Sequence, residues 1–148
     1  MSIRVSDQIF LLNMRDGVIL KKFGTTGGSS QFNSPGGITI HQSYLYVCDV
    51  GNDRIQIVEK KKGKFINQWK GFNSPRCIYF HDEIEIFFVG DAYSVQLFTK
   101  DNICVQRLDF RHFTAIPALY FTAIPALCVF DDRLYVADFR NDRIQIFE

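Results

Sequence analysis

Short apolar runs separated by polar turns follow one another along most of this chain. No segment places apolar residues at spacings of three and four over ten residues, so the pattern predicts strands and no helix. Runs such as Tyr44 to Asp49 and Ile84 to Val89 are almost continuously apolar, which is typical of strands covered on both faces. Later runs, such as Phe65 to Lys70, are more polar and should face water. We therefore expect an all-β chain.

The pattern also repeats at a fixed interval. Phe32 to Pro35 returns forty residues later as Phe72 to Pro75, and Asn52 to Ile57 returns letter for letter as Asn141 to Ile146. A fixed period between about 20 and 50 residues indicates stacked structural units. Each unit is a four-stranded meander that runs from an apolar first strand to a polar fourth strand, as in a blade of a β-propeller. The sequence predicts an incomplete propeller, with two full four-stranded blades and a partial blade at each end.

The repeats divide the chain into four segments: a partial blade (1–24), a full blade (25–71), a degenerate full blade (72–110) and a partial blade (111–148). The last segment holds a duplication, because Phe113 to Leu119 recurs eight residues later as Phe121 to Leu127. The second copy is expected to form a strand and the first copy an exposed loop. Uncovered blade faces and strand edges at the two ends predict either a segment of a longer chain or association of copies through those ends.

Composition narrows the class of protein further. The chain has 148 residues and is 47% hydrophobic, enough for the core of one domain. Lysine and arginine number 17 against 16 acidic residues, so there is no overall attraction to nucleic acid or to an anionic membrane. The chain lacks the pattern of a secretory signal, and no apolar run approaches the ~18 residues that a spanning helix needs. We expect a cytoplasmic protein without membrane contact.

The cysteines are scattered along the sequence without a close pair, which argues against a zinc ribbon and against a disulfide framework. Each is expected to be a small buried apolar residue in a reducing compartment. The four positions are Cys48, Cys77, Cys104 and Cys128.

The repeated motifs resemble those of the NHL repeat family. Pro35-Gly36 precedes a first strand, Leu45 to Asp49 follows the Leu-Tyr-Val-x-Asp pattern of a second strand, and Asn52 to Ile55 opens a third. The last unit has the same motifs, whereas the middle unit keeps Asp91 and lacks the Asn and the Arg. The resemblance implies blades of a six-bladed propeller. In tripartite-motif NHL proteins such a propeller binds a protein or single-stranded RNA on its loop face, often for a ubiquitin ligase.

We expect a non-catalytic scaffold that binds a protein partner on the loop face. Arginine and aromatic residues dominate the energetic centres of interfaces, and the candidate anchors are Arg54, Arg76, Phe139, Arg140 and Arg143. Binding of single-stranded RNA by the same face is the alternative, for which Arg111 is a further candidate. A lyase or lactonase of propeller type is the second alternative. It would need acids or metal ligands inside the first strands, and these contain none, so no catalytic residue and no cofactor is expected.

Some polar residues have simpler explanations. The repeated Asp, Asn and Arg are expected to satisfy backbone groups in the loops and to pair between blades. His41 and His81 lie forty residues apart, and Asp131 is expected to hold the equivalent place in the last unit. Two imidazoles and a carboxylate can bind a metal ion. We favour ordinary turns at these three positions, and a solvated turn at Lys60 to Lys62.

Overall fold

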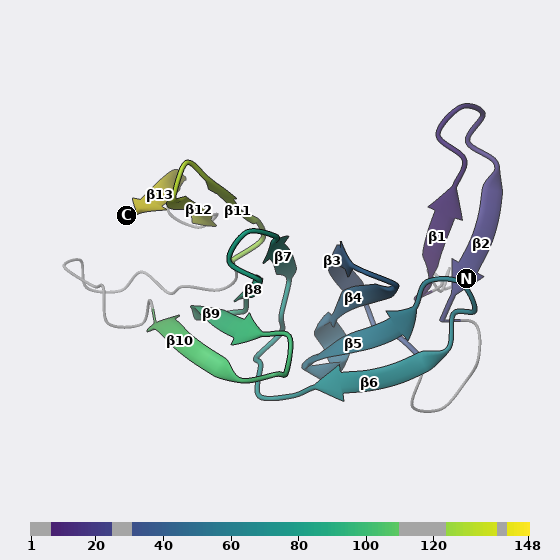
Figure 1. Ribbon diagram of the computed structural model, residues 1–148, viewed down its shortest axis with the longest axis horizontal. Helices are drawn as coiled ribbons and strands as arrows, with labels where there is room; N and C mark the ends of the chain where they lie inside the picture. The colour runs from purple at the N-terminus through teal and green to yellow at the C-terminus, as the bar shows by residue number, and fades with distance from the viewer. Residues whose placement is uncertain (1–6, 25–30, 110–123, 139–141) are drawn as a thin grey trace, which may run out of the picture.

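A computed structural model describes residues 7–24, 31–109, 124–138 and 142–148 of the chain (Figure 1). Thirteen strands form four antiparallel sheets, and within the described residues the only helical element is a short 3-10 turn, η1 (Val50–Asn52). We call the sheets blades 1 to 4. Blade 1 holds β1 (Ile9–Leu12) and β2 (Ile19–Phe23), and blade 2 holds β3 (Pro35–His41), β4 (Tyr44–Asp49), β5 (Arg54–Glu59) and β6 (Phe65–Trp69). Blade 3 holds β7 (Cys77–His81), β8 (Ile86–Gly90), β9 (Ser94–Thr99) and β10 (Cys104–Asp109), and blade 4 holds β11 (Leu127–Phe130), β12 (Arg133–Asp138) and β13 (Arg143–Phe147).

The all-β prediction is confirmed, with two complete four-stranded sheets flanked by partial ones. Within each sheet the strands pair in chain order. The sheets follow one another along an arc, with β3 and β7 close together at its centre and β6 and β10 on its outer side (Figure 1). The Gly37 N–H donates to the Arg76 carbonyl of the next blade at 2.8 Å. A Cβ on Gly37 would lie 2.8 Å from that oxygen, so only glycine permits this approach.

Consecutive blades pack face to face, and we call the side toward the next blade the far face and the side toward the preceding blade the near face. Between blades 2 and 3, Trp69 stacks on Phe98 with ring centroids 5.8 Å apart, and Tyr46 meets Phe87 at 4.4 Å. Similar apolar clusters fill the space between blades 1 and 2 and between blades 3 and 4. The core therefore lies between the blades, as stacked repeats require.

The predicted covering of the second strands on both faces is confirmed for β4 and β8, which are buried along almost their whole length. It is wrong for β12, whose residues alternate between buried and more exposed, because the described residues place no further blade on the far face of blade 4. The outer strands β6 and β10 are largely exposed, as their polar composition predicts.

The duplicated segment is placed as predicted in its second copy, since Leu127 begins β11. Ile124, just before this strand, is fully buried, and its N–H donates to the Asp91 carbonyl at 3.2 Å. The first copy lies outside the described residues. None of the described segments forms a helix with the length and apolar character needed to cross a membrane.

The expectation that all cysteines are buried is half wrong. Cys48 and Cys77 are buried, and burial is the main cause that raises the pKa of both thiols, to about 12 for Cys77. Cys104 and Cys128 are exposed. Cys104 belongs to the outermost strand of blade 3, and Cys128 alternates with half-buried residues along β11.

Candidate binding face

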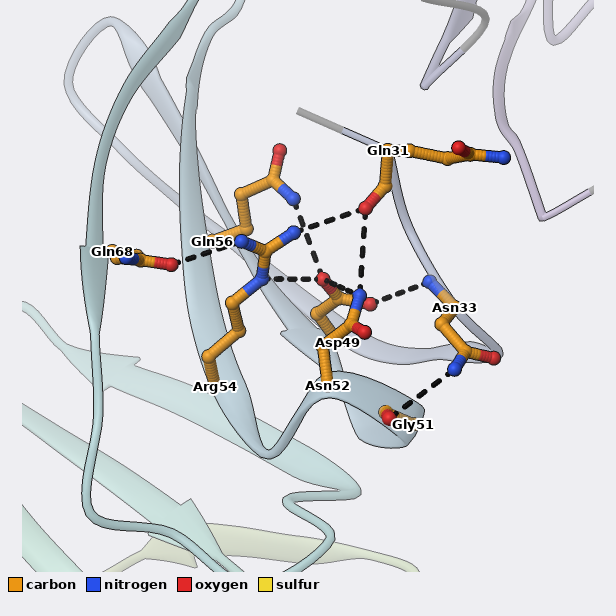
Figure 2. Close-up of polar contacts among 8 residues, drawn as sticks. All are labelled: Gln31, Asn33, Asp49, Gly51, Asn52, Arg54, Gln56 and Gln68. Carbon is orange, nitrogen blue, oxygen red and sulfur yellow. Dashed lines mark hydrogen bonds and ion pairs between the residues drawn. The ribbon is translucent and has the colours of Figure 1, made fainter. Parts of the chain in front are cut away.

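A buried aspartate at the end of the second strand organises each of blades 2 to 4. In blade 2, Asp49 is fully buried, and its Oδ1 accepts the Asn33 N–H at 2.7 Å (Figure 2). Its Oδ2 accepts Asn52 Nδ2 at 2.8 Å and Arg54 Nε at 2.6 Å. This carboxylate therefore joins the segment that leads into β3 to η1 and to the start of β5.

Arg54 completes this node from the other side. Its Nη1 donates to Gln68 Oε1 on β6 at 2.9 Å, and its Nη2 donates to the Gln31 carbonyl at 2.9 Å (Figure 2). The side chain is only 11% exposed. A guanidinium held by a carboxylate, an amide and a carbonyl has little surface left for a partner, so Arg54 serves its own blade.

Contacts between blades are made by a neighbouring residue instead. The described partners of Arg54, which are Asp49, Gln68 and Gln31, belong to its own unit. Asp53 makes such a contact, because its Oδ1 accepts the Ser74 N–H at the start of the next unit at 2.7 Å. Asp7 Oδ1 accepts the Ser34 N–H in the same way at 2.8 Å.

The aspartate node persists where the motif has degenerated. In blade 3, Asp91 accepts the Ser94 N–H at 2.8 Å and Gln96 Nε2 at 2.9 Å, so Ser94 replaces the missing arginine. In blade 4, Asp138 Oδ2 accepts Arg143 Nε at 2.9 Å and Gln145 Nε2 at 2.8 Å. A repeated glutamine is thus a partner of the aspartate, which the sequence analysis missed. The available signal was that Gln56 and Gln145 occupy the same position of the repeated hexapeptide and that Gln96 lies forty residues after Gln56.

These nodes hold two kinds of loop on one face. The Gly51 N–H in η1 donates to the Asn33 carbonyl at 2.9 Å, and in blade 3 the Ala92 N–H donates to the Asn73 carbonyl at 2.8 Å. The loops between second and third strands therefore lie beside the loops that lead into the first strands, as the sequence predicts. We call this the loop face, formed by residues 31–36, 50–53, 72–76, 91–93 and 124–126.

A hollow of about 540 Å³ lies in the inner part of the loop face. Its lining residues are Ser34, Pro35, Gly36, Val50, Gly51, Ser74, Arg76 and Pro125. Strand register makes Gly36, Arg76 and Pro125 equivalent positions of three blades, each two residues before the residue that pairs with Val47, Val89 or Val136. Among the described residues of this lining Arg76 alone is charged, and it is exposed. Its backbone is fixed, because its N–H donates to the Gly90 carbonyl at 2.9 Å and its carbonyl accepts from Gly37.

A second hollow, of about 600 Å³, lies between blades 1 and 2. Its lining is Asp7, Gln31, Phe32, Asn33, Asn52, Arg54, Gln68 and Lys70. Among the described lining residues Arg54 and Lys70 are cationic and Asp7 is anionic, and Arg54 is already paired with Asp49. The second hollow therefore offers little net charge to a ligand.

Comparisons with known proteins identify the fold. No family model matches the sequence, and no curated protein matches it. The WD40 β-propeller domain of Doa1 superposes with a TM-score of 0.68 and 16% identity, over 96% of this chain and 44% of that chain. A protein of unknown function from Bacteroides caccae superposes with a TM-score of 0.67 and 19% identity, over 88% of this chain and 48% of that chain. Hydrazine synthase from Kuenenia stuttgartiensis gives 0.66 and 12%, over 88% of this chain and 35% of that chain.

The chain is an incomplete β-propeller. It spans less than half the length of these three neighbours, and at such identities their likeness establishes the fold alone.

Of the other predicted anchors, the structure describes only Arg143. Arg143 is half-exposed and bound to Asp138, as described above. Phe139 and Arg140, and also Arg111, lie outside the described residues.

Two of the three metal candidates, His81 and Asp131, line one hollow of about 460 Å³, and His41 is not part of its lining. The described residues contain no group of three or more His, Cys, Asp or Glu side chains placed to hold a metal ion. The His41 ring packs on Phe80 at 4.0 Å, and His81 lies edge-on to Tyr79. β3 and β7 end at the two histidines, whereas β11 ends at Phe130, so the predicted equivalence of Asp131 is wrong by one residue.

Proposed function

We propose that this propeller is a non-catalytic, NHL-type scaffold of the cytoplasm that binds a protein partner on its loop face, with Arg76 as the central anchor. The observation that carries the proposal is the position of Arg76: an exposed guanidinium, on a backbone fixed by two hydrogen bonds, in a hollow whose other described lining residues are neutral. An arginine in such a setting is pre-organised to bind a carboxylate through two parallel hydrogen bonds.

The walls of the hollow suit a peptide. Ser34 and Ser74 supply hydroxyl groups, and Pro35, Pro125 and Val50 supply small apolar surfaces. These groups can accompany an extended segment whose acidic side chain reaches Arg76. Phe139 and Arg140 belong to the sequence of the corresponding loop of blade 4, and we retain them as secondary anchors.

RNA binding is favoured less than protein binding. Single strands are gripped by exposed aromatic rings as well as by cations. Among the described residues the well-exposed phenylalanines are Phe10, within β1, and Phe130, at the end of β11 away from the loop face. Asp7 and Asp53 also lower the positive potential near the loop face.

Catalysis is favoured less as well. The first strands β3, β7 and β11 carry no carboxylate, and their two histidines stand at the strand ends against aromatic rings. A propeller lyase or lactonase would need such groups inside these strands, around the channel.

The decisive experiment compares Arg76→Glu with Lys62→Glu. Both variants reverse one positive charge, but Lys62 lies in the turn between β5 and β6, at the opposite ends of the strands. Wild type and Lys62→Glu should capture the same proteins from a lysate treated with RNase, and Arg76→Glu should lose them while melting at the wild-type temperature. Combined Phe139→Ala and Arg140→Ala changes should weaken capture.

Two outcomes would contradict the proposal. Capture that survives Arg76→Glu but disappears with Lys62→Glu would assign binding to the opposite rim. Capture that disappears on RNase treatment would favour RNA as the ligand.

A further inference from the structure

Identical sequences lie in different surroundings in blades 2 and 4. The hexapeptide Asn-Asp-Arg-Ile-Gln-Ile occurs in both. In blade 2, Ile55 is 0% and Ile57 is 6% exposed, whereas the equivalent Ile144 and Ile146 are 70% and 57% exposed. The first pair is buried because blade 3 covers the far face of blade 2. Since the two sequences are the same, the far face of blade 4 is a blade-docking surface that no blade among the described residues covers.

The complementary surface is uncovered at the other end of the molecule. In blade 3, Ile78 and Phe80 on the first strand are 8% and 6% exposed, because they pack against the far face of blade 2. Their equivalents on β3 of blade 2 are Ile38 and Ile40, which are 42% and 54% exposed. Blade 1 has only two strands in the described residues, and it covers the part of blade 2 around Leu45, Val47 and Val58 instead.

We propose that the far face of blade 4 binds the near face of blade 2 in a second copy of this chain, head to tail. Ile144 and Ile146 of one copy then contact Ile38 and Ile40 of the other, as Ile55 and Ile57 belong to one apolar cluster with Ile78 and Phe80 within the chain. The chain contains both surfaces of this interface. Each surface is buried between blades 2 and 3, and its equivalent is exposed at one end of the described residues, so a second copy of the chain can supply the missing partner.

Two further observations fit a second copy. β13 pairs only with β12 and β1 only with β2 among the described strands, so the joint brings together two strands that each have an unpaired edge. The chain covers 44% of one propeller neighbour and 48% of another, so two copies contain about as many residues as one such propeller. A head-to-tail interface uses different surfaces on the two copies, and rings can close through it.

The test is sedimentation equilibrium from about 1 to 100 µM, in the range where interfaces of moderate area associate. Wild type should form dimers, and Ile144→Asp or Ile40→Asp should weaken dimerisation by about tenfold or more, because each places a charge in an apolar contact. Val105→Asp on the outer strand β10 is the matched control, since Val105 is 54% exposed and lies away from both surfaces. All three sites are exposed in the single copy, and thermal melts will verify that the variants fold.

Mixing the variants decides the geometry. Ile144→Asp blocks one end and Ile40→Asp the other, so a 1:1 mixture keeps one intact interface and should again form dimers. A wild type that stays monomeric over this range would overturn the proposal. So would a mixture that stays monomeric, and so would a Val105→Asp variant as impaired as the other two. The proposal is independent of the loop face, because none of these residues lines the hollow around Arg76.

Discussion

The repeated hexapeptide provides a stability experiment with an internal control. Ile55→Ala and Ile144→Ala make the same chemical change in the same local sequence on the third strand of a blade. Ile55 is fully buried, so the substitution removes three buried carbon atoms, a loss of about 2.5 kcal/mol in transfer free energy. The cavity left between the blades raises the expected destabilisation to about 3 to 4 kcal/mol. Ile144 is 70% exposed, so its loss should be about 0.5 kcal/mol.

Any change in β-propensity acts on both variants, so the difference of about 2.5 to 3.5 kcal/mol reports the covering by blade 3. Urea unfolding should be followed by far-UV circular dichroism and by the fluorescence of Trp69, the single tryptophan, which is 1% exposed in the same interface. Measurements belong below about 1 µM, where a dimer would dissociate. Equal destabilisation by the two substitutions, with unchanged m-values, would refute the argument that the neighbouring blade decides the role of this motif.

Three further predictions concern the aspartate node, the duplication and the thiols. Asp49→Ala should destabilise the fold by about 3 to 5 kcal/mol in the same urea titration, because it leaves the buried guanidinium of Arg54 without its carboxylate; a loss below about 1 kcal/mol would contradict this role. Deleting residues 120–127 removes one copy of the duplicated segment and should leave the melting temperature equal or higher, since a shorter connection costs less closure entropy; a drop of several degrees would show that both copies are structural. A thiol reagent should modify two cysteines in the native protein and the other two only on unfolding, and early reaction of all four would refute the burial pattern. The reactive pair is Cys104 and Cys128, and the protected pair is Cys48 and Cys77.

The stability contributed by the buried thiols of Cys48 and Cys77 depends on pH, and the sign follows from their raised pKa values. The pKa of Cys77 rises from 9.0 to about 12 on folding, so between these values the folded state holds a proton that the unfolded state has lost. The stability that this thiol contributes is present in full below about pH 9 and declines as the pH rises toward about 12. The free energy of unfolding from urea titrations should therefore fall as the pH rises above about 9. A free energy of unfolding that is unchanged between about pH 9 and pH 11 would contradict the raised pKa.

Much of the fold could be predicted from the sequence because the repeat is encoded in short sequence motifs. Turn residues and short apolar runs recur at nearly constant intervals, and they predict the strands and the order in which the strands pair. The position of the loop face followed too, since loops at the same end of a meander lie together. The aspartate node was visible as a motif, but the motif alone did not show that a glutamine of the third strand is its partner.

The burial of particular residues could not be predicted in the same way. Arg54 and Arg143 occupy the same position of identical hexapeptides, yet their side chains are 11% and 50% exposed. Arg54 is covered by Gln68 on the fourth strand of its own blade, whereas the described residues of blade 4 include no fourth strand, and the hexapeptide itself does not record this difference. The error at Asp131 is one of strand register. Phe130, which pairs with Arg133, is the equivalent of His41 and His81, which pair with Tyr44 and Ile86.

The repeat separates residues that build the propeller from residues that are free to vary on it. Asp49 and Asp91 each bind the loop that leads into the first strand as well as groups after the second strand, and Asp138 binds Arg143 and Gln145 on the third strand. At the neighbouring equivalent position the three blades instead carry Gly36, Arg76 and Pro125, and all three line the hollow. The backbone register does not require an arginine at this position, because a glycine and a proline occupy it in the other two blades. The fold therefore does not dictate the identity of Arg76, which is the reason why we propose it as the anchor of the loop face.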